Sequence, residues 1–202
     1  MKNYFSLFVL ISAVSLFLFV FLSSMSQKTN ASSNNPLPDT QSNNTLKSSP
    51  ENINTYSKSA ADFVGISHWL NSKDKPLTIS QLKGNVVLID FWTYTCINCI
   101  QTLPYITKWY DRYKDKGFVV IGIHTPEFPF EKNTDNVQKA IKQYNIQYPV
   151  AQDNDYKTWN AYGNQYWPAF YLIDKKGTIR YQHFGEGDYD KTEAQIQHLL
   201  KE

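Results

Sequence analysis

The sequence contains little cysteine and little arginine. Its cysteines are Cys96 and Cys99, and its arginines are Arg112 and Arg180. The two cysteines can pair only with each other or with a thiol of another molecule, and they supply only half of the ligand set of a structural zinc site. The net charge is +2, and no stretch combines dense basic charge with aromatic residues. We therefore expect neither a metal site nor binding to nucleic acid.

The beginning of the chain lacks charge. No charged side chain occurs from residue 3 to residue 27, and the run from Leu7 to Leu22 is almost entirely apolar. Its length lies between a signal-peptide core and a membrane span. We expect residues 1–26 to be a signal peptide cleaved after Ser26, or an anchor that holds the chain in the inner membrane by residues 4–22. The rest of the chain is exported in both cases, and no nearby cysteine offers a site for lipid attachment.

Residues 27–61 contain few hydrophobic side chains. Ser, Asn, Thr and Gln dominate this stretch, and Tyr56 is its one aromatic residue. Such a composition cannot bury enough apolar surface to offset the entropy lost on ordering. The sequence therefore predicts a flexible polar linker over residues 27–61 and a folded domain over residues 62–202.

The domain shows strand and helix patterns in alternation. The apolar run Val86–Phe91, interrupted by Asp90, predicts a buried strand. A helix follows Cys99, contains Pro104 and ends at Gly117. The further predicted strands cover residues 118–123, 148–151, 169–173 and 178–184, and the further predicted helices cover residues 134–144 and 156–162 and a final segment capped by Asp190. This order indicates a mixed α/β sandwich.

The two cysteines lie between the first predicted strand and its helix, with two residues between them. This spacing brings both sulfurs onto one helical turn. The helix N-terminus favours a thiolate and can lower a cysteine pKa from about 8.5 into the range of about 3.5–7.5. A disulfide across four residues removes little entropy from the unfolded chain, so the spacing favours catalysis over stabilisation. We predict a thiol–disulfide oxidoreductase in which Cys96 is the nucleophile and Cys99 resolves the mixed disulfide.

The order of elements resembles the thioredoxin fold. Asp90 lies six positions before the first cysteine, where thioredoxins have a buried acid, and Trp92 matches the tryptophan beside their active site. Pro104 matches the family's helix-kinking proline, and Trp167-Pro168 matches its cis-proline loop. The resemblance implies a thioredoxin-like three-layer sandwich with a mixed central sheet.

Longer runs are similar to a narrower group. The helix expected between residues 123 and 150 resembles the insertion of the TlpA-like, exported branch. Residues 91–99, 124–128 and 166–174 resemble the thioredoxin-like domain associated with membrane electron carriers of the DsbD/CcdA (DipZ) type. This resemblance implies a reductase in the bacterial periplasm or cell envelope, fed by such a carrier and acting on disulfide-bearing or thiol-bearing exported proteins. It implies no cofactor.

The resemblance also implies roles for individual residues. Asp90 would exchange a proton with Cys99, and burial would raise its pKa, because the lysine that thioredoxin places near this acid has no counterpart here. Trp92, Trp167 and Pro168, the last of these in cis, would line the substrate groove.

Two residue pairs remain without an assignment. The dipeptide Ile97-Asn98 differs from the Gly-Pro of cytoplasmic thioredoxin, so no redox potential can be transferred. His124 and Glu127 follow the second strand at the edge of the sheet where the cysteines lie.

Two other functions fit part of the pattern. A thiol peroxidase of the peroxiredoxin type would use Thr93, three positions before Cys96, but Ile89 stands where that pattern has a proline. A copper-binding metallochaperone would combine the two thiolates with His124 or His183. Exported copper carriers of this fold space their cysteines more widely, so the oxidoreductase remains the main hypothesis.

Overall fold

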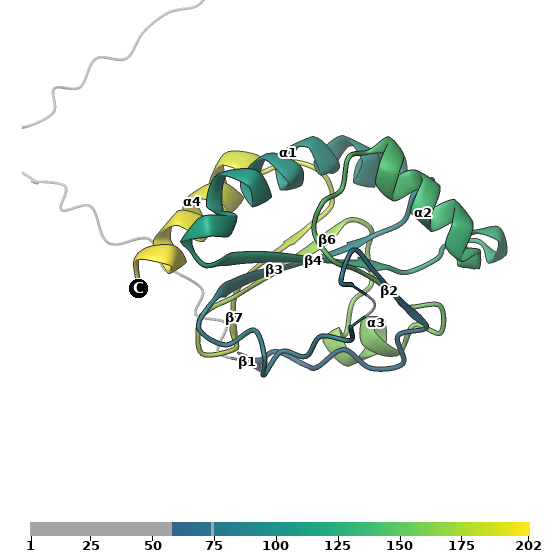
Figure 1. Ribbon diagram of the computed structural model, residues 1–202. Helices are drawn as coiled ribbons and strands as arrows, with labels where there is room; N and C mark the ends of the chain where they lie inside the picture. Colours follow the sequence, from purple (N-terminus) through teal and green to yellow (C-terminus); the bar gives the residue numbers. More distant parts are fainter. Residues whose placement is uncertain (1–57, 74) are drawn as a thin grey trace, which may run out of the picture. The chain divides into compact units, whose positions relative to one another are not determined.

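A mixed sheet of seven strands forms the middle of the fold, in the order β1-β7-β6-β3-β4-β5-β2. The computed structural model describes residues 58–73 and 75–202 (Figure 1), so the predicted signal peptide or anchor and most of the predicted linker lie outside the described residues. Within the described part of the chain, no helix combines the length and apolar character needed to cross a membrane. The strands are β1 (Lys58–Ser59), β2 (His68–Leu70), β3 (Val86–Trp92), β4 (Phe118–His124), β5 (Val150–Gln152), β6 (Ala169–Ile173) and β7 (Thr178–Phe184).

Strands β3, β4 and β5 run parallel in the centre of the sheet. β6 pairs antiparallel with β3 and continues through a tight turn into β7. The short strands β1 and β2 pair antiparallel with β7 and β5 at the two edges. The α-helices are α1 (Ile97–Tyr113), α2 (Thr134–Gln143), α3 (Lys157–Tyr162) and α4 (Tyr189–Lys201), and the 3-10 helices are η1 (Lys114–Lys116) and η2 (Pro129–Lys132).

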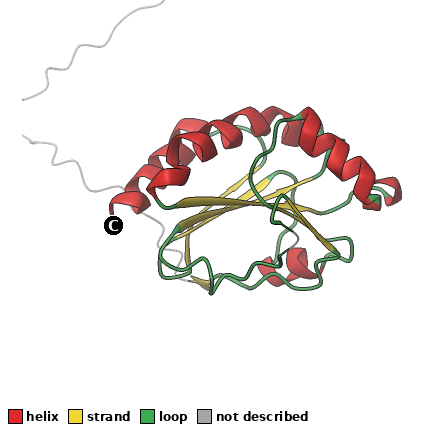
Figure 2. Cartoon of the chain, viewed as in Figure 1, coloured by secondary structure: helices red, strands yellow, loops and turns green. Residues whose placement is uncertain are grey.

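The helices lie on both faces of the sheet (Figures 1 and 2). Helices α1, α2 and α4 cover one face, and α3 lies on the other with the segment that precedes β3. Successive residues of β3 point to opposite faces: Leu88 and Trp92 belong to the core under α1, which we call the α1-side core, whereas Ile89 and Phe91 belong to the core under α3. By this alternation the side chain of Asp90 faces α1.

The predicted elements are found in the structure. β3 is buried at every position, as expected for a strand covered on both faces. Helix α1 begins at Ile97, contains Pro104, and tightens into η1 before Gly117, whose φ of 83° ends it. Helix α2 lies between β4 and β5, in the segment predicted to carry the additional helix. The three-layer sandwich with a mixed sheet and a helical insertion is therefore confirmed.

Two features differ from the sequence analysis. The predicted cap at Asp190 is wrong, because α4 begins at Tyr189 and its N-cap residue makes no side-chain hydrogen bond. Glu193, the expected partner in that cap, instead accepts hydrogen bonds from Arg112 and Tyr113 and ties α4 to α1. The edge strands β1 and β2 were not expected, since two and three residues are too few to show an alternating pattern.

Candidate active site

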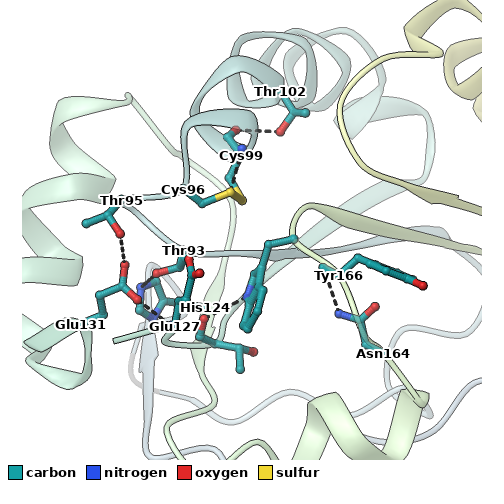
Figure 3. Close-up of a disulfide and its surroundings, with 12 residues drawn as sticks. Thr93, Thr95, Cys96, Cys99, Thr102, His124, Glu127, Glu131, Asn164 and Tyr166 are labelled. Atoms are coloured by element: carbon teal, nitrogen blue, oxygen red, sulfur yellow. Dashed lines mark hydrogen bonds between the residues drawn. A yellow bond between two sulfur atoms is a disulfide. The ribbon is translucent and has the colours of Figure 1, made fainter. Parts of the chain in front are cut away.

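Cys96 and Cys99 form a disulfide at the N-terminus of α1 (Figure 3), with their Cα atoms 5.2 Å apart. Cys96 is the N-cap of the helix, and its Sγ accepts a hydrogen bond from the backbone N–H of Cys99 at 3.2 Å. Cys96 is half-buried, whereas Cys99 has no exposed surface. A second molecule can therefore reach the sulfur of Cys96 and not that of Cys99.

The buried strand β3 fixes the position of the cysteines. Phe91 makes edge-on contacts with Trp159, Tyr162 and Tyr171 on one face of the sheet. Such aromatic pairs add stabilisation beyond the burial of their area. The chain leaves β3 at Trp92 and enters α1 five residues later, at Ile97, so the cysteines sit on a rigid base at the carboxyl end of the parallel strands.

Asp90 is completely buried and faces the α1-side core, which also contains Cys99. Neither carboxyl oxygen has a hydrogen-bond partner among the described residues. Burial raises the pKa of Asp90 from 3.8 to about 8, because the charged form loses its hydration. The expected burial and the expected direction of the pKa shift are both found. At neutral pH this carboxyl is mostly neutral, yet it can lose its proton at little cost.

The loop before β6 carries the other predicted site residues. The Trp167–Pro168 peptide bond is cis, as the resemblance implied. The indole of Trp167 is half-buried and donates a hydrogen bond to the Thr125 carbonyl at 3.1 Å, which joins the loop to the segment after β4. Its ring also packs on Trp159, with centroids 4.2 Å apart.

Trp92 does not line a groove. Its side chain has no exposed surface and belongs to the α1-side core. Contrary to expectation, Trp92 therefore has no surface to offer a substrate, because its place in β3 turns the indole under α1. Its influence on the site comes through packing.

Sequence reasoning missed Glu131, which lies in η2 and is fully buried. One oxygen of its carboxylate accepts a hydrogen bond from the Thr95 hydroxyl (Figure 3), and the other accepts the backbone N–H groups of Glu127 at 2.6 Å and Phe128 at 3.0 Å. Burial alone would raise the pKa of Glu131, but the hydrogen bonds outweigh it and the net shift is downward. A charged carboxylate therefore holds the residue that precedes Cys96.

A sequence signal for Glu131 was present. Phe128-Pro129-Phe130-Glu131 places a proline at the first position of η2 and a glutamate at the third, the pattern of a capped helix start. The backbone bonds of Glu131 follow from this pattern. Its bond to Thr95, from a segment 36 residues earlier, does not.

His124 ends β4 underneath the same loop. Its Nε2 lies 3.3 Å from the Thr93 hydroxyl, and its ring stacks on Tyr94 with centroids 5.5 Å apart. Burial lowers the pKa of His124 to about 4, so the imidazole is neutral at physiological pH. Glu127 exposes its side chain and takes part in the network through its backbone. His124 therefore packs beneath the loop that carries Cys96 and does not form part of the exposed surface of the site.

The two alternative functions gain no support from this geometry. Thr93, on which the peroxidase hypothesis depends, is buried and faces His124, so its hydroxyl is not offered to a peroxide. Across residues 58–73 and 75–202, no three or more His, Cys, Asp or Glu side chains gather as they would around a metal ion.

The chain is similar to known proteins over this domain. The family model described as Redoxin matches residues 33–200. Protein DipZ of Mycobacterium tuberculosis is 52% identical over 144 residues, which are 71% of this chain and 21% of DipZ. The thiol-disulfide oxidoreductase ResA of Bacillus thuringiensis is 32% identical over 127 residues, which are 63% of this chain and 68% of ResA. The chain spans about a fifth or less of the length of the first curated relatives that it matches.

Solved structures show the same architecture. The putative thiol:disulfide interchange protein DsbE from Chlorobium tepidum has a TM-score of 0.63 at 30% identity, covering 72% of this chain and 97% of that one. A putative thioredoxin from Neisseria meningitidis has a TM-score of 0.61 at 32% identity, covering 72% of this chain and 91% of that one. These similarities confirm the predicted thioredoxin-like fold.

Proposed function

The chain belongs to the Redoxin family as a thioredoxin-like thiol–disulfide oxidoreductase, and from this premise we propose that it is an exported reductase of protein disulfides. The observation that carries the proposal is the unequal exposure of the two sulfurs. The half-buried Cys96 caps α1 and can meet a substrate, while the buried Cys99 lies one turn further along and can meet only Cys96.

The first step is an attack by Cys96. In the reduced protein the N-terminus of α1 stabilises the Cys96 thiolate. This thiolate attacks one sulfur of the substrate disulfide, a bond forms between that sulfur and Cys96 Sγ, and the substrate S–S bond breaks. The leaving thiolate takes a proton from water. The product is a mixed disulfide with the substrate.

The second step is resolution by Cys99. Its thiol gives its proton to the Asp90 carboxylate and attacks Cys96 Sγ, which forms the Cys96–Cys99 disulfide and releases the second substrate thiolate. Two electrons have then passed from the cysteine pair to the substrate. The pKa of Asp90, about 8, lies far closer than that of an ordinary carboxyl to the value of about 8.5 for a free thiol, so Asp90 is a better-matched base for a thiol.

The surface near the cysteines suits a polypeptide substrate. Ile97, directly after Cys96, is 64% exposed, and the aromatic rings of Phe128 and Phe130 are exposed on η2 and the residue before it. The half-buried Trp167 forms the opposite wall in our proposal, and the cis Pro168 that follows it is buried. Exposed apolar side chains of this kind mark interaction sites, and a disulfide-bearing exported protein would place apolar residues against them.

The electrons would come from a membrane carrier of the DsbD/CcdA type, with this chain exported to the periplasm or cell envelope. The similarity to DipZ and the apolar N-terminal run of the sequence support this part of the proposal. Loss of such a carrier is expected to shift the cysteine pair from the reduced to the oxidised form, which thiol alkylation in cells measures.

Trapping tests the proposal as a whole. The Cys99→Ala variant, expressed with its N-terminal segment, should accumulate mixed disulfides on Cys96 with exported proteins. The Cys96→Ala variant is the matched control and should trap none, because Cys99 is buried. Equal adducts on both variants, or none on either, would contradict the proposed roles.

A further inference from the structure

We propose that Tyr148 is a positioning residue for Asp90, and that its buried phenol is the polar partner of this carboxyl on the proton path to Cys99. The inference rests on the proposed role of Asp90 in thiol–disulfide exchange. It concerns a residue that lies outside every sequence motif, in the segment that leads into β5.

Gly122 brings Tyr148 next to Asp90. Gly122 is the register partner of Asp90 in the neighbouring strand β4. A Cβ atom on Gly122 would lie 3.2 Å from Tyr148 Cε2 and 3.0 Å from Trp92 Nε1. Register partners in adjacent strands project to the same face of a sheet. The phenol ring and the indole therefore fill the space that the glycine leaves open, on the face to which Asp90 points.

Four buried polar atoms of Asp90 and of the two side chains that close over Gly122 lack a partner. They are the two carboxyl oxygens of Asp90, the Tyr148 hydroxyl and Trp92 Nε1, each buried and without a hydrogen bond to any described residue. Buried polar groups in proteins are nearly always hydrogen-bonded to protein or water. The phenol and the indole are donors, and the ionised carboxyl is an acceptor. This set suits an internal water that joins the phenol to the carboxyl.

The phenol of Tyr148 is uncharged beside Asp90. Burial is the cause that raises the pKa of Asp90, and no charged side chain of the described residues contributes to the shift. Burial, and then the charge of Asp90, raise the pKa of Tyr148 well above its usual value. The Tyr110 ring of α1 packs on Tyr148 with centroids 5.8 Å apart, and the cysteines and further tyrosines of the α1-side core are Cys96, Cys99, Tyr94, Tyr113, Tyr144, Tyr181 and Tyr189. The same face carries His124, the register partner of Trp92, and His183, the register partner of Phe170.

The residues that flank Asp90 in the neighbouring strands carry no charge. Gly122 of β4 and Phe170 of β6 flank Asp90, and α2 and α4 contribute hydrophobic side chains to the α1-side core. Tyr148 stays protonated over the whole working range. It can therefore act on Asp90 only through hydrogen bonding, by stabilising the carboxylate.

The test is a pH titration of Asp90 in the oxidised full-length protein. The chemical shift of the ¹³C-labelled Asp90 carboxyl reports its protonation. In Tyr148→Phe the carboxylate loses a donor, and its pKa should rise by about one unit. The matched control is Tyr162→Phe, since Tyr162 is also buried with an unpartnered hydroxyl but lies in the core under α3. An unchanged Asp90 titration in Tyr148→Phe, or an equal rise in the control, would overturn the proposal.

A second measurement leaves Tyr148 in place. The Tyr148 Cζ signal of the wild-type protein should show an inflection at the titration of Asp90, near pH 8, and Asp90→Asn should abolish it. A wild-type signal without that inflection would also overturn the proposal. The proposed function is tested separately by the rate of mixed-disulfide resolution against pH. If the Asp90 titration moves in Tyr148→Phe and the pH dependence of the resolution rate does not, Tyr148 remains the hydrogen-bonding partner of Asp90, and the role of Asp90 as the base for Cys99 is overturned.

Discussion

The hydroxyl of Thr95 donates a hydrogen bond to the carboxylate of Glu131, which joins the residue before the half-buried Cys96 to the segment after β4. Thr95 lies in the turn between β3 and α1, and Glu131 lies in η2. The same carboxylate accepts the backbone N–H groups of Glu127 and Phe128. One buried charge therefore organises both the loop that carries Cys96 and the loop that exposes the aromatic rings beside it.

Replacing this charge should loosen both loops. Glu131→Gln removes charge-assisted hydrogen bonds, each worth about 1.5–3 kcal/mol, and should lower the free energy of unfolding by about that amount. The reaction of reduced Cys96 with a model disulfide should slow as well. Urea unfolding and stopped-flow kinetics measure the two effects. Glu127→Gln is the control, because its side chain is exposed; a loss of equal size in this variant would contradict the assignment.

The Glu131 contribution should depend on pH. The pKa of this carboxyl is lowered in the folded protein, so its stabilisation is present above the ordinary value of 4.5 and is lost as the pH falls through the folded pKa. Acid unfolding of the wild-type protein and of Glu131→Gln should therefore converge at low pH. A stability difference that persists unchanged in acid would argue against an ionised Glu131.

Asp90 should show the opposite dependence. Its folded pKa is raised from 3.8 to about 8, so the stability that this group contributes is fully present below pH 3.8 and declines as the pH rises toward 8. Asp90→Asn cannot ionise and should be the more stable protein at pH 7, by up to about 4 kcal/mol. Urea unfolding at several pH values measures the gap, which should widen from acid to neutral pH. A gap that does not change with pH would contradict the buried, neutral carboxyl.

The same variant should be a slower enzyme. Without the carboxylate, Cys99 has no base to take its proton, and resolution of the mixed disulfide should slow by about 100-fold, within the range of general-base catalysis. The rate in the wild-type protein should rise with pH up to the pKa of Asp90. Quenched-flow analysis of a preformed mixed disulfide isolates this step. Asp111→Asn, which alters an exposed carboxyl on the same helix, should leave the rate unchanged.

Gly122 should tolerate no side chain. A Cβ atom there would lie 3.0 Å from Trp92 Nε1, and both Trp92 and Tyr148 are fully buried and cannot move aside. Gly122→Ala should lower the free energy of unfolding by about 1–3 kcal/mol, the usual cost of overpacking a core. Thermal or urea unfolding measures it. A stability at or above the wild-type value would show that Trp92 and Tyr148 do not close over this glycine.

Local patterns were enough to predict much of the fold. The apolar run of β3 and the spacing of the two cysteines showed where a strand meets a helix, and resemblance supplied the buried Asp90 and the cis Pro168. These features are visible because each depends on neighbouring residues or on a motif. The edge strands β1 and β2 were missed, since pairing with distant strands and not their own sequence makes them strands.

The unpredicted parts of the site depend on contacts between distant segments. The bond between Thr95 and Glu131 depends on how the loop after β4 returns to α1. The contact of Tyr148 with Gly122 depends on the path of the chain into β5. The resemblance led us to expect Trp92 to line the substrate groove, whereas its position in β3 buries it. These contacts and this burial depend on strand register and on packing between distant segments, which cannot be derived from a single sequence.

The most direct test of the central claim is a single-turnover reaction of pre-reduced protein with a model peptide disulfide. The wild-type protein should release two substrate thiols per molecule and finish with the Cys96–Cys99 disulfide, Cys99→Ala should release one and keep the other substrate sulfur on Cys96, and Cys96→Ala should release none. Release of thiols by Cys96→Ala at the wild-type rate would contradict the account.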